Sequence, residues 1–151
     1  FALNGALTIG TWDGANIEMA QAMGADNMFV FGLRTHEAQR VRELGYDPRL
    51  YVEENRQLQR VMHAIGAGDF SLGNVQRYKP LVQSLLGRDH YLLMADFASY
   101  VAAQSKVDAL FAQPAAWAER ALLNVAAMGE FSSDHTIAQY VDRVWSAAAV
   151  A

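Results

Sequence analysis

The sequence has 151 residues, of which 52% are apolar and 19% charged, and a chain of this size and composition folds around a packed core. Twelve basic and sixteen acidic side chains give a net charge of −4. No stretch concentrates Lys or Arg, which excludes nucleic-acid binding and electrostatic membrane anchoring.

Because the sequence contains no cysteine, disulfides, thiolate catalysis and Cys-based zinc sites are excluded, and a cytoplasmic location is expected. No apolar run approaches the roughly 20 residues of a membrane span, and no signal peptide is predicted.

The first third of the chain has the pattern strand, helix, strand. Residues 6–12 are apolar and rich in β-branched side chains, which predicts a strand covered on both faces. Residues 16–23 predict a short helix that ends with a left-handed Gly24, and residues 27–32 predict a second apolar strand. This order indicates a parallel crossover in an α/β sheet.

The pattern beyond Gly32 is helical. Thr35 is predicted to cap a helix that continues to Leu44, and Asp47 with Pro48 predicts the start of a long helix. The apolar face of that long helix and the glycines that close it are Leu58, Val61, Met62, Ile65, Gly66 and Gly68.

The remaining segments predict a loop, a short strand and four further helices. The loop covers residues 69–74, a helix follows at 78–86, and residues 91–94 form a possible third strand before Asp96 caps the next helix. The apolar stripe of that helix comprises Phe97, Tyr100, Val101, Val107, Leu110 and Phe111, with Gln104 as its polar interruption.

Two more helices complete the chain. Pro114 opens the first, and Ser132–Asp134 precedes the second. Their predicted apolar faces are Trp117, Ala121, Leu122 and Val125, and Ile137, Tyr140, Val141, Val144 and Trp145. Residues 147–151 are expected to fray.

Local motifs for catalysis and metal binding have simpler structural explanations. Residues 132–135 read Ser-Ser-Asp-His, but neighbours in sequence cannot form a hydrolase triad, so helix capping is favoured. The four histidines, His36, His63, His90 and His135, lack the spacing of metal ligands. Glycines 66, 68 and 73 do not reproduce a dinucleotide fingerprint.

The segment Asp13–Glu18 joins a strand to a helix, where open α/β sheets build their ligand crevice. Turn formation and capping are favoured over ligand contact there, because Asp13 would repel an anion. Two or three parallel strands are too few for a complete sheet. The chain also begins with Phe1 instead of methionine, so we expect that a longer polypeptide precedes it.

Residues 4–11 and 13–18 resemble the part of glycogen and maltodextrin phosphorylases that directly follows the cofactor lysine of that family. Further matches occur in the same order along the chain, at residues 27–32, 45–46, 94–97, 100–101, 131–134 and 136–137. Trp12 stands where that family has a smaller apolar residue, and His135 where arginine is common. The resemblance covers almost the whole chain.

The resemblance implies an α/β fold. Residues 1–151 would be the C-terminal portion of the second Rossmann-like domain of a two-domain (GT-B type) glycosyltransferase, with strand–helix–strand in 1–32 and mainly helices in 33–151. Their partner is the missing N-terminal portion of the same protein, and the family's final helix crosses back onto the first domain. The parent enzyme is expected to be a homodimer, and the fragment alone is expected to self-associate.

The resemblance also implies pyridoxal phosphate chemistry in the parent enzyme. Phosphate cleaves α-1,4-glucan, and α-D-glucose 1-phosphate is released; glycogen and maltodextrin remain alternative substrates. The cofactor lysine of the family lies one residue before the position of Phe1, whereas Lys79 and Lys106 do not match its motif.

No catalytic, cofactor-binding or metal-binding residue is therefore assigned to this chain, which is expected to be inactive by itself. Residues 4–16 are expected to support the cofactor site from behind. The alternative is a free-standing helical protein-interaction module.

Overall fold

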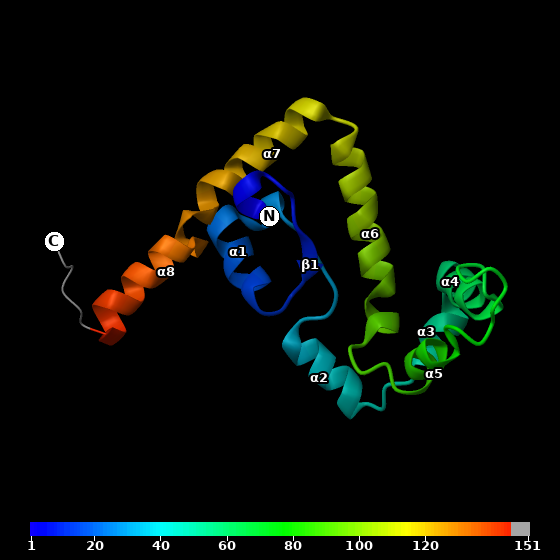
Figure 1. Ribbon diagram of the computed structural model, residues 1–151. Coiled ribbons are helices and arrows are strands. Elements are labelled where there is room, and N and C mark those ends of the chain that lie inside the picture. The colour runs from blue at the N-terminus through cyan, green and yellow to red at the C-terminus, as the bar shows by residue number, and fades with distance from the viewer. Residues whose placement is uncertain (146–151) are drawn as a thin grey trace. The chain divides into compact units, whose positions relative to one another are not determined.

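A computed structural model describes residues 1–145 of the chain. Its elements, in chain order (Figure 1), are η1 (Ala2–Asn4), β1 (Ile9–Thr11), α1 (Ala15–Met23), η2 (Ala25–Asn27), β2 (Phe29–Phe31), α2 (Thr35–Glu43), α3 (Pro48–Glu54), α4 (Arg56–Ala67), α5 (Lys79–Gly87), α6 (Leu93–Phe111), α7 (Pro114–Ala127), η3 (Met128–Phe131), α8 (Ser133–Tyr140) and η4 (Val141–Trp145).

The described residues form two compact units. Unit 1 contains residues 1–10, 14–30 and 105–145, and unit 2 contains residues 11–13 and 31–104. No helix among residues 1–145 combines the length and the apolar character that crossing a membrane requires.

Unit 1 contains the predicted strand–helix–strand order. Strands β1 and β2 pair in a parallel two-stranded sheet, and the Phe29 N–H donates to the Thr8 carbonyl at 2.9 Å. The prediction that residues 6–12 form a strand covered on both faces is wrong, since the Ile9 side chain is 37% exposed. β2 is the only strand beside β1 in the described part of the chain, so β1 lacks the second neighbour that burial requires.

Helix α7 packs against η1 and α1 in unit 1, close to the N-terminus (Figure 1). Gly5, which ends η1, adopts a φ of 82°, and a Cβ built on it would lie at an ordinary contact distance of 3.7 Å from the Ala121 Cβ, so α7 passes close to this turn. Gly24 ends α1 as predicted, but not in the predicted left-handed helical conformation, because its φ of 85° is combined with a ψ of 133°. Pro114 opens α7 as predicted.

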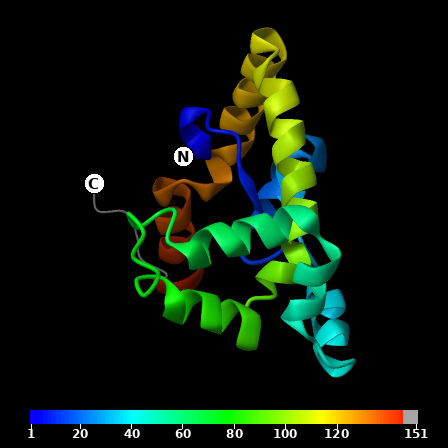
Figure 2. The ribbon, with the colours of Figure 1, turned by 90° about the vertical axis from the view of Figure 1, so that its right-hand side faces the viewer.

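Unit 2 is helical, with α4 and α5 connected through the loop of residues 68–78 (Figure 2). The buried core of this part of the unit is formed by Leu58, Met62 and Met94. Leu58 and Met62 lie on the face of α4 that the sequence predicted to be apolar, which confirms that face.

The long helix predicted from Pro48 is two helices, α3 and α4. The Asp47 carboxylate caps α3 by accepting the Arg49 N–H at 2.9 Å, as predicted. However, the Asn55 side-chain oxygen accepts the N–H groups of Gln57 and Leu58 at 3.0 Å. Asparagine is among the best N-caps, so a new helix begins after Asn55.

Residues 91–94 are not a strand. The buried Asp89 carboxylate accepts the N–H groups of Leu93 at 3.0 Å and Met94 at 2.8 Å, which starts α6 at Leu93. Asp89 and Leu92 both have positive φ angles, 35° and 60°, so the backbone turns where an extended strand was predicted. The prediction that Asp96 caps α6 is therefore wrong.

Helix α2 also has a different start from the predicted one. Thr35 is its first residue, and the Glu37 carboxylate accepts the Arg34 N–H at 2.8 Å. Gly68 ends α4 as predicted, and it does so in the left-handed region with φ 86° and ψ 18°. Gly66 was also predicted to close this helix but lies inside it.

Capping by Ser132 is confirmed, because its Oγ accepts the His135 N–H at 3.2 Å. In unit 1, the predicted apolar face of the last helices is exposed at Ile137, Tyr140, Val144 and Trp145. Residues 147–151 lie outside the described residues.

Candidate functional site

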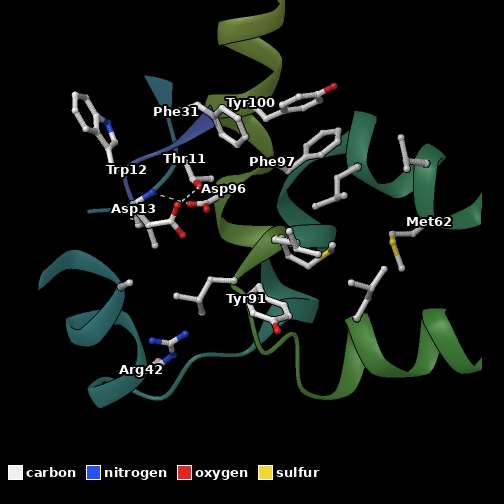
Figure 3. A pocket seen from close by; sticks show the side chains of 18 of the residues that line it. Thr11, Trp12, Asp13, Phe31, Arg42, Met62, Tyr91, Asp96, Phe97 and Tyr100 are labelled. Carbon is white, nitrogen blue, oxygen red and sulfur yellow. Dashed lines mark hydrogen bonds between the residues drawn. The ribbon is translucent and has the colours of Figure 1, made fainter. Parts of the chain in front are cut away.

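A hollow of about 700 Å³ lies within unit 2 (Figure 3). It begins where β1 and β2 end, at Thr11–Asp13 and Phe31, and it extends between α2, α4, α5 and α6. This is the carboxyl end of two parallel strands, the edge at which α/β proteins bind their ligands. We call it the unit 2 hollow.

The wall of the unit 2 hollow is mainly apolar. Its apolar and aromatic side chains are Trp12, Phe31, Leu33, Ala38, Leu58, Val61, Met62, Ile65, Leu85, Tyr91, Leu92, Leu93, Met94, Phe97 and Tyr100. The rings of Phe31 and Tyr100 meet edge to face with centroids 5.3 Å apart, a favourable geometry for an aromatic pair.

Two carboxylates lie together at one end of the unit 2 hollow (Figure 3). Asp13 accepts a hydrogen bond from the Thr11 hydroxyl at 3.0 Å, and Asp96 accepts one from the Leu33 N–H at 2.8 Å. Burial raises the pKa of Asp96, and the nearby charge of Asp89 raises it further, while the hydrogen bond from Leu33 opposes both effects. A raised carboxyl pKa is common at functional sites but also occurs in purely structural clusters.

Gly32 allows this carboxylate to approach the backbone closely. A Cβ at Gly32 would lie 2.7 Å from the Asp96 Oδ2, and its φ is 83°, so only glycine fits without strain. The Gly32 N–H donates to the Ser99 Oγ at 2.9 Å, which ties the end of β2 to α6.

A basic side chain stacks on an aromatic ring beside the same carboxylates. The Arg34 guanidinium lies 4.6 Å from the centre of the Trp12 ring, within the range of a cation–π contact. The sequence showed Trp12 as an unusual residue but did not predict this contact, because Trp12 follows β1 whereas Arg34 follows β2, far along the chain.

Most of the segments examined for chemistry in the sequence have structural roles. Asp13 bonds to the hydroxyl two residues earlier, which is consistent with turn formation, yet it also lines the unit 2 hollow. In residues 1–145, no three His, Asp or Glu side chains gather closely enough to hold a metal ion. Lys79 and Lys106 are exposed.

The sequence pattern does not indicate that aromatic side chains line the unit 2 hollow. The sequence predicts Phe97 and Tyr100 only as part of a helix stripe, and Tyr91 as part of a strand. The spacing of Phe97 and Tyr100 was the available signal, but it is the same for a core-facing stripe and for the wall of a cavity.

Comparison with known proteins decides the family. Residues 1–147 match the family described as "Carbohydrate phosphorylase". The chain belongs to the carbohydrate phosphorylase family. It is 47% identical over 146 residues to a glycogen phosphorylase of Synechocystis, 42% identical over 147 residues to the brain form from Ovis aries, and 40% identical over 145 residues to the human muscle form. The first two alignments cover 97% of this chain and the third covers 96%.

The chain spans 17% of the length of each of these phosphorylases. The family generally depends on pyridoxal phosphate, whose aldehyde requires a lysine amine. Neither of the two lysines lines the unit 2 hollow, and both extend from exposed helix positions. The described residues therefore do not fit covalent attachment of that cofactor.

Proposed function

We propose that this chain is the C-terminal part of a glycogen or α-1,4-glucan phosphorylase, a glycosyltransferase that uses inorganic phosphate to release α-D-glucose 1-phosphate. The observation that carries this proposal is the family match over residues 1–147, together with 40–47% identity to glycogen phosphorylases. The interaction-module alternative has no comparable support.

Pyridoxal phosphate belongs to the parent enzyme in this proposal, and the lysine that holds it lies outside the 151 residues. The chain contributes the end of the second Rossmann-like domain of a GT-B enzyme, residues 1–151. The parallel pair of β1 and β2 and the helical character of residues 33–145 support this assignment. Residues 4–16 support the cofactor site from behind.

The parent enzyme is a cytoplasmic homodimer in this proposal, and the N-terminal portion of the same polypeptide is the principal partner of the chain. The absence of cysteine from the sequence supports a reducing compartment. The chain alone is inactive, since it supplies no amine suited to the cofactor.

The test compares the 151-residue chain with the longer polypeptide that contains it. Each is incubated with pyridoxal phosphate, phosphate and either glycogen or maltodextrin, and glucose 1-phosphate release is measured. We expect turnover and the absorbance of lysine-bound pyridoxal phosphate only from the longer polypeptide.

Two results would contradict the proposal. Turnover by the 151 residues alone would show that the chain is a complete enzyme, and a longer polypeptide without turnover on either glucan would refute the assigned reaction. Replacing Lys79 and Lys106 by arginine in the longer polypeptide is the control, and it should leave the lysine-bound absorbance unchanged.

A further inference from the structure

The unit 2 hollow has an apolar wall that nothing in unit 2 covers. Its lining includes the buried side chains of Leu58, Met62 and Met94, but also Val61, which is 40% exposed, and Tyr91, which is 77% exposed. Apolar surface facing water is unfavourable in proportion to its area. A contiguous apolar surface of this kind marks a site of interaction.

The volume of the hollow, about 700 Å³, falls within the roughly 300–1,000 Å³ of small-molecule pockets. Such pockets also present a few polar groups that converge on the ligand. Here the three charged side chains of the lining already have partners in unit 2. Asp13 is bonded to Thr11, Asp96 to the Leu33 N–H, and Arg42 donates to the His90 carbonyl at 3.0 Å.

This arrangement favours recognition by apolar contact over recognition by directed hydrogen bonds. The relatives supply a source for an apolar occupant, because more than four-fifths of their length lies outside the part that this chain matches. A segment of the same polypeptide is also present at high effective concentration. It therefore needs no specific polar contacts to occupy the site.

We propose that, in the longer phosphorylase, the unit 2 hollow is filled by an apolar segment of the same polypeptide from outside these 151 residues. This rests on the proposed function only in assuming that the chain is part of a longer phosphorylase. The segment needs no charge of its own to match Asp13, Asp96 or Arg42, because each of these side chains already has a partner in unit 2.

The first test is Val61→Glu, made in the 151-residue chain and in the longer polypeptide. In the chain alone the new carboxylate remains in water, so the midpoint of thermal unfolding changes by less than about 1 °C. In the longer polypeptide the carboxylate is buried without a partner, so the midpoint of the transition that includes unit 2 falls by more than ~2 °C. Leu72→Glu is the matched control, because Leu72 is fully exposed at 106% and lies outside the hollow; it should be tolerated in both.

The second test is hydroxyl-radical footprinting of the unsubstituted proteins, which needs no variant to fold. Tyr91 and Tyr100 should be oxidised at least about threefold more slowly in the longer polypeptide than in the chain alone. Phe70, which is 68% exposed and outside the hollow, serves as the control and should react equally in both.

Equal oxidation of Tyr91 and Tyr100 in the two proteins, or tolerance of Val61→Glu in the longer polypeptide, would overturn the inference. Protection that appears only after glucan or phosphate is added would also overturn it, because a small molecule would then be the occupant. None of these readouts uses phosphorylase activity. A longer polypeptide without turnover would therefore refute the proposed reaction and leave this inference standing.

Discussion

Asp89 is the residue on which the turn before α6 depends. Its buried carboxylate accepts the N–H groups of Leu93 and Met94 and the hydroxyl of Tyr46, the last at 2.5 Å. Three donors offset the cost of removing a carboxylate from water. Burial raises the pKa of Tyr46 well above its ordinary value, and the hydrogen bond and charge of Asp89 raise it further. The phenol therefore stays protonated and continues to donate.

Tyr46→Phe should lower the free energy of unfolding of unit 2 by about 1–3 kcal/mol, because it removes a hydrogen bond to a buried charge. Urea denaturation measures the loss. Tyr91→Phe is the control, since the Tyr91 hydroxyl makes no hydrogen bond within residues 1–145 and its removal should change little. Equal effects of the two substitutions would contradict the role of Tyr46.

The same pair predicts a pH dependence. Because the Tyr46 pKa is raised in the folded state, its contribution to stability is complete below about pH 10, the ordinary tyrosine pKa, and is lost as the pH rises above it. The difference in stability between the unsubstituted chain and Tyr46→Phe should therefore be constant from pH 6 to about 9 and shrink above that range. A difference that grew at high pH would have the wrong sign.

Asn124 is the opposite case, a buried polar residue without partners. Its side chain is 0% exposed on α7, and neither amide atom has a hydrogen-bond partner within residues 1–145. An unsatisfied buried amide costs about 1–3 kcal/mol, so Asn124→Leu should raise the free energy of unfolding of unit 1 by about 1 kcal/mol or more. Thermal unfolding of the variant measures this gain.

Asn55→Leu is the matched comparison in unit 2, because the Asn55 oxygen caps α4, and this change should cost about 0.5–2 kcal/mol. A destabilised Asn124→Leu variant would show instead that the amide has a buried partner, such as a water molecule.

At the scale of elements, the sequence predicted helices and strands wherever a residue pattern and a local stop signal agreed. Pro114 and Ser132 marked helix starts correctly because proline and serine act locally. The errors came from side chains that cap at a distance or interrupt a continuous pattern. The Asn55 cap divided a helix whose apolar spacing continued through it, and the Asp89 carboxylate reached four and five residues ahead to start α6.

Alanine substitutions at the two glycines near the end of α4, Gly66 and Gly68, are predicted to have opposite effects on stability. At Gly68 the φ is 86°, and a Cβ would lie 2.9 Å from the carbonyl carbon of Gly73, so Gly68→Ala should cost about 1 kcal/mol or more. Gly66 lies inside the helix with open space around it, so Gly66→Ala should stabilise by roughly 0.5–1 kcal/mol. Helix content and the midpoint of urea unfolding check both variants, and effects of the same sign would show that α4 ends elsewhere.

At the scale of the whole molecule, the family could be recognised from continuous segments such as residues 4–11, and the comparisons confirm it over residues 1–147. The unit 2 hollow could not be predicted. It combines Trp12 and Phe31 with α4 and α6, and tertiary packing alone brings these segments together. Sequence periodicity indicates which helix face is apolar, but it does not indicate whether that face meets a neighbour within the same unit.

The exposed apolar residues of α8 and η4 predict how the 151-residue chain behaves alone. Trp145 is 58% exposed and Ile137 is 52% exposed, and a patch of this kind is covered by association when no other surface covers it. The chain should therefore self-associate at micromolar concentrations, measured by sedimentation equilibrium, and Ile137→Ser combined with Trp145→Ser should shift it toward the monomer. Ala138→Ser, at an exposed position of the same helix, removes little apolar surface and should leave the association unchanged. A chain that stays monomeric at every concentration would show that this surface is stable in water, and the association predicted from it would then be wrong.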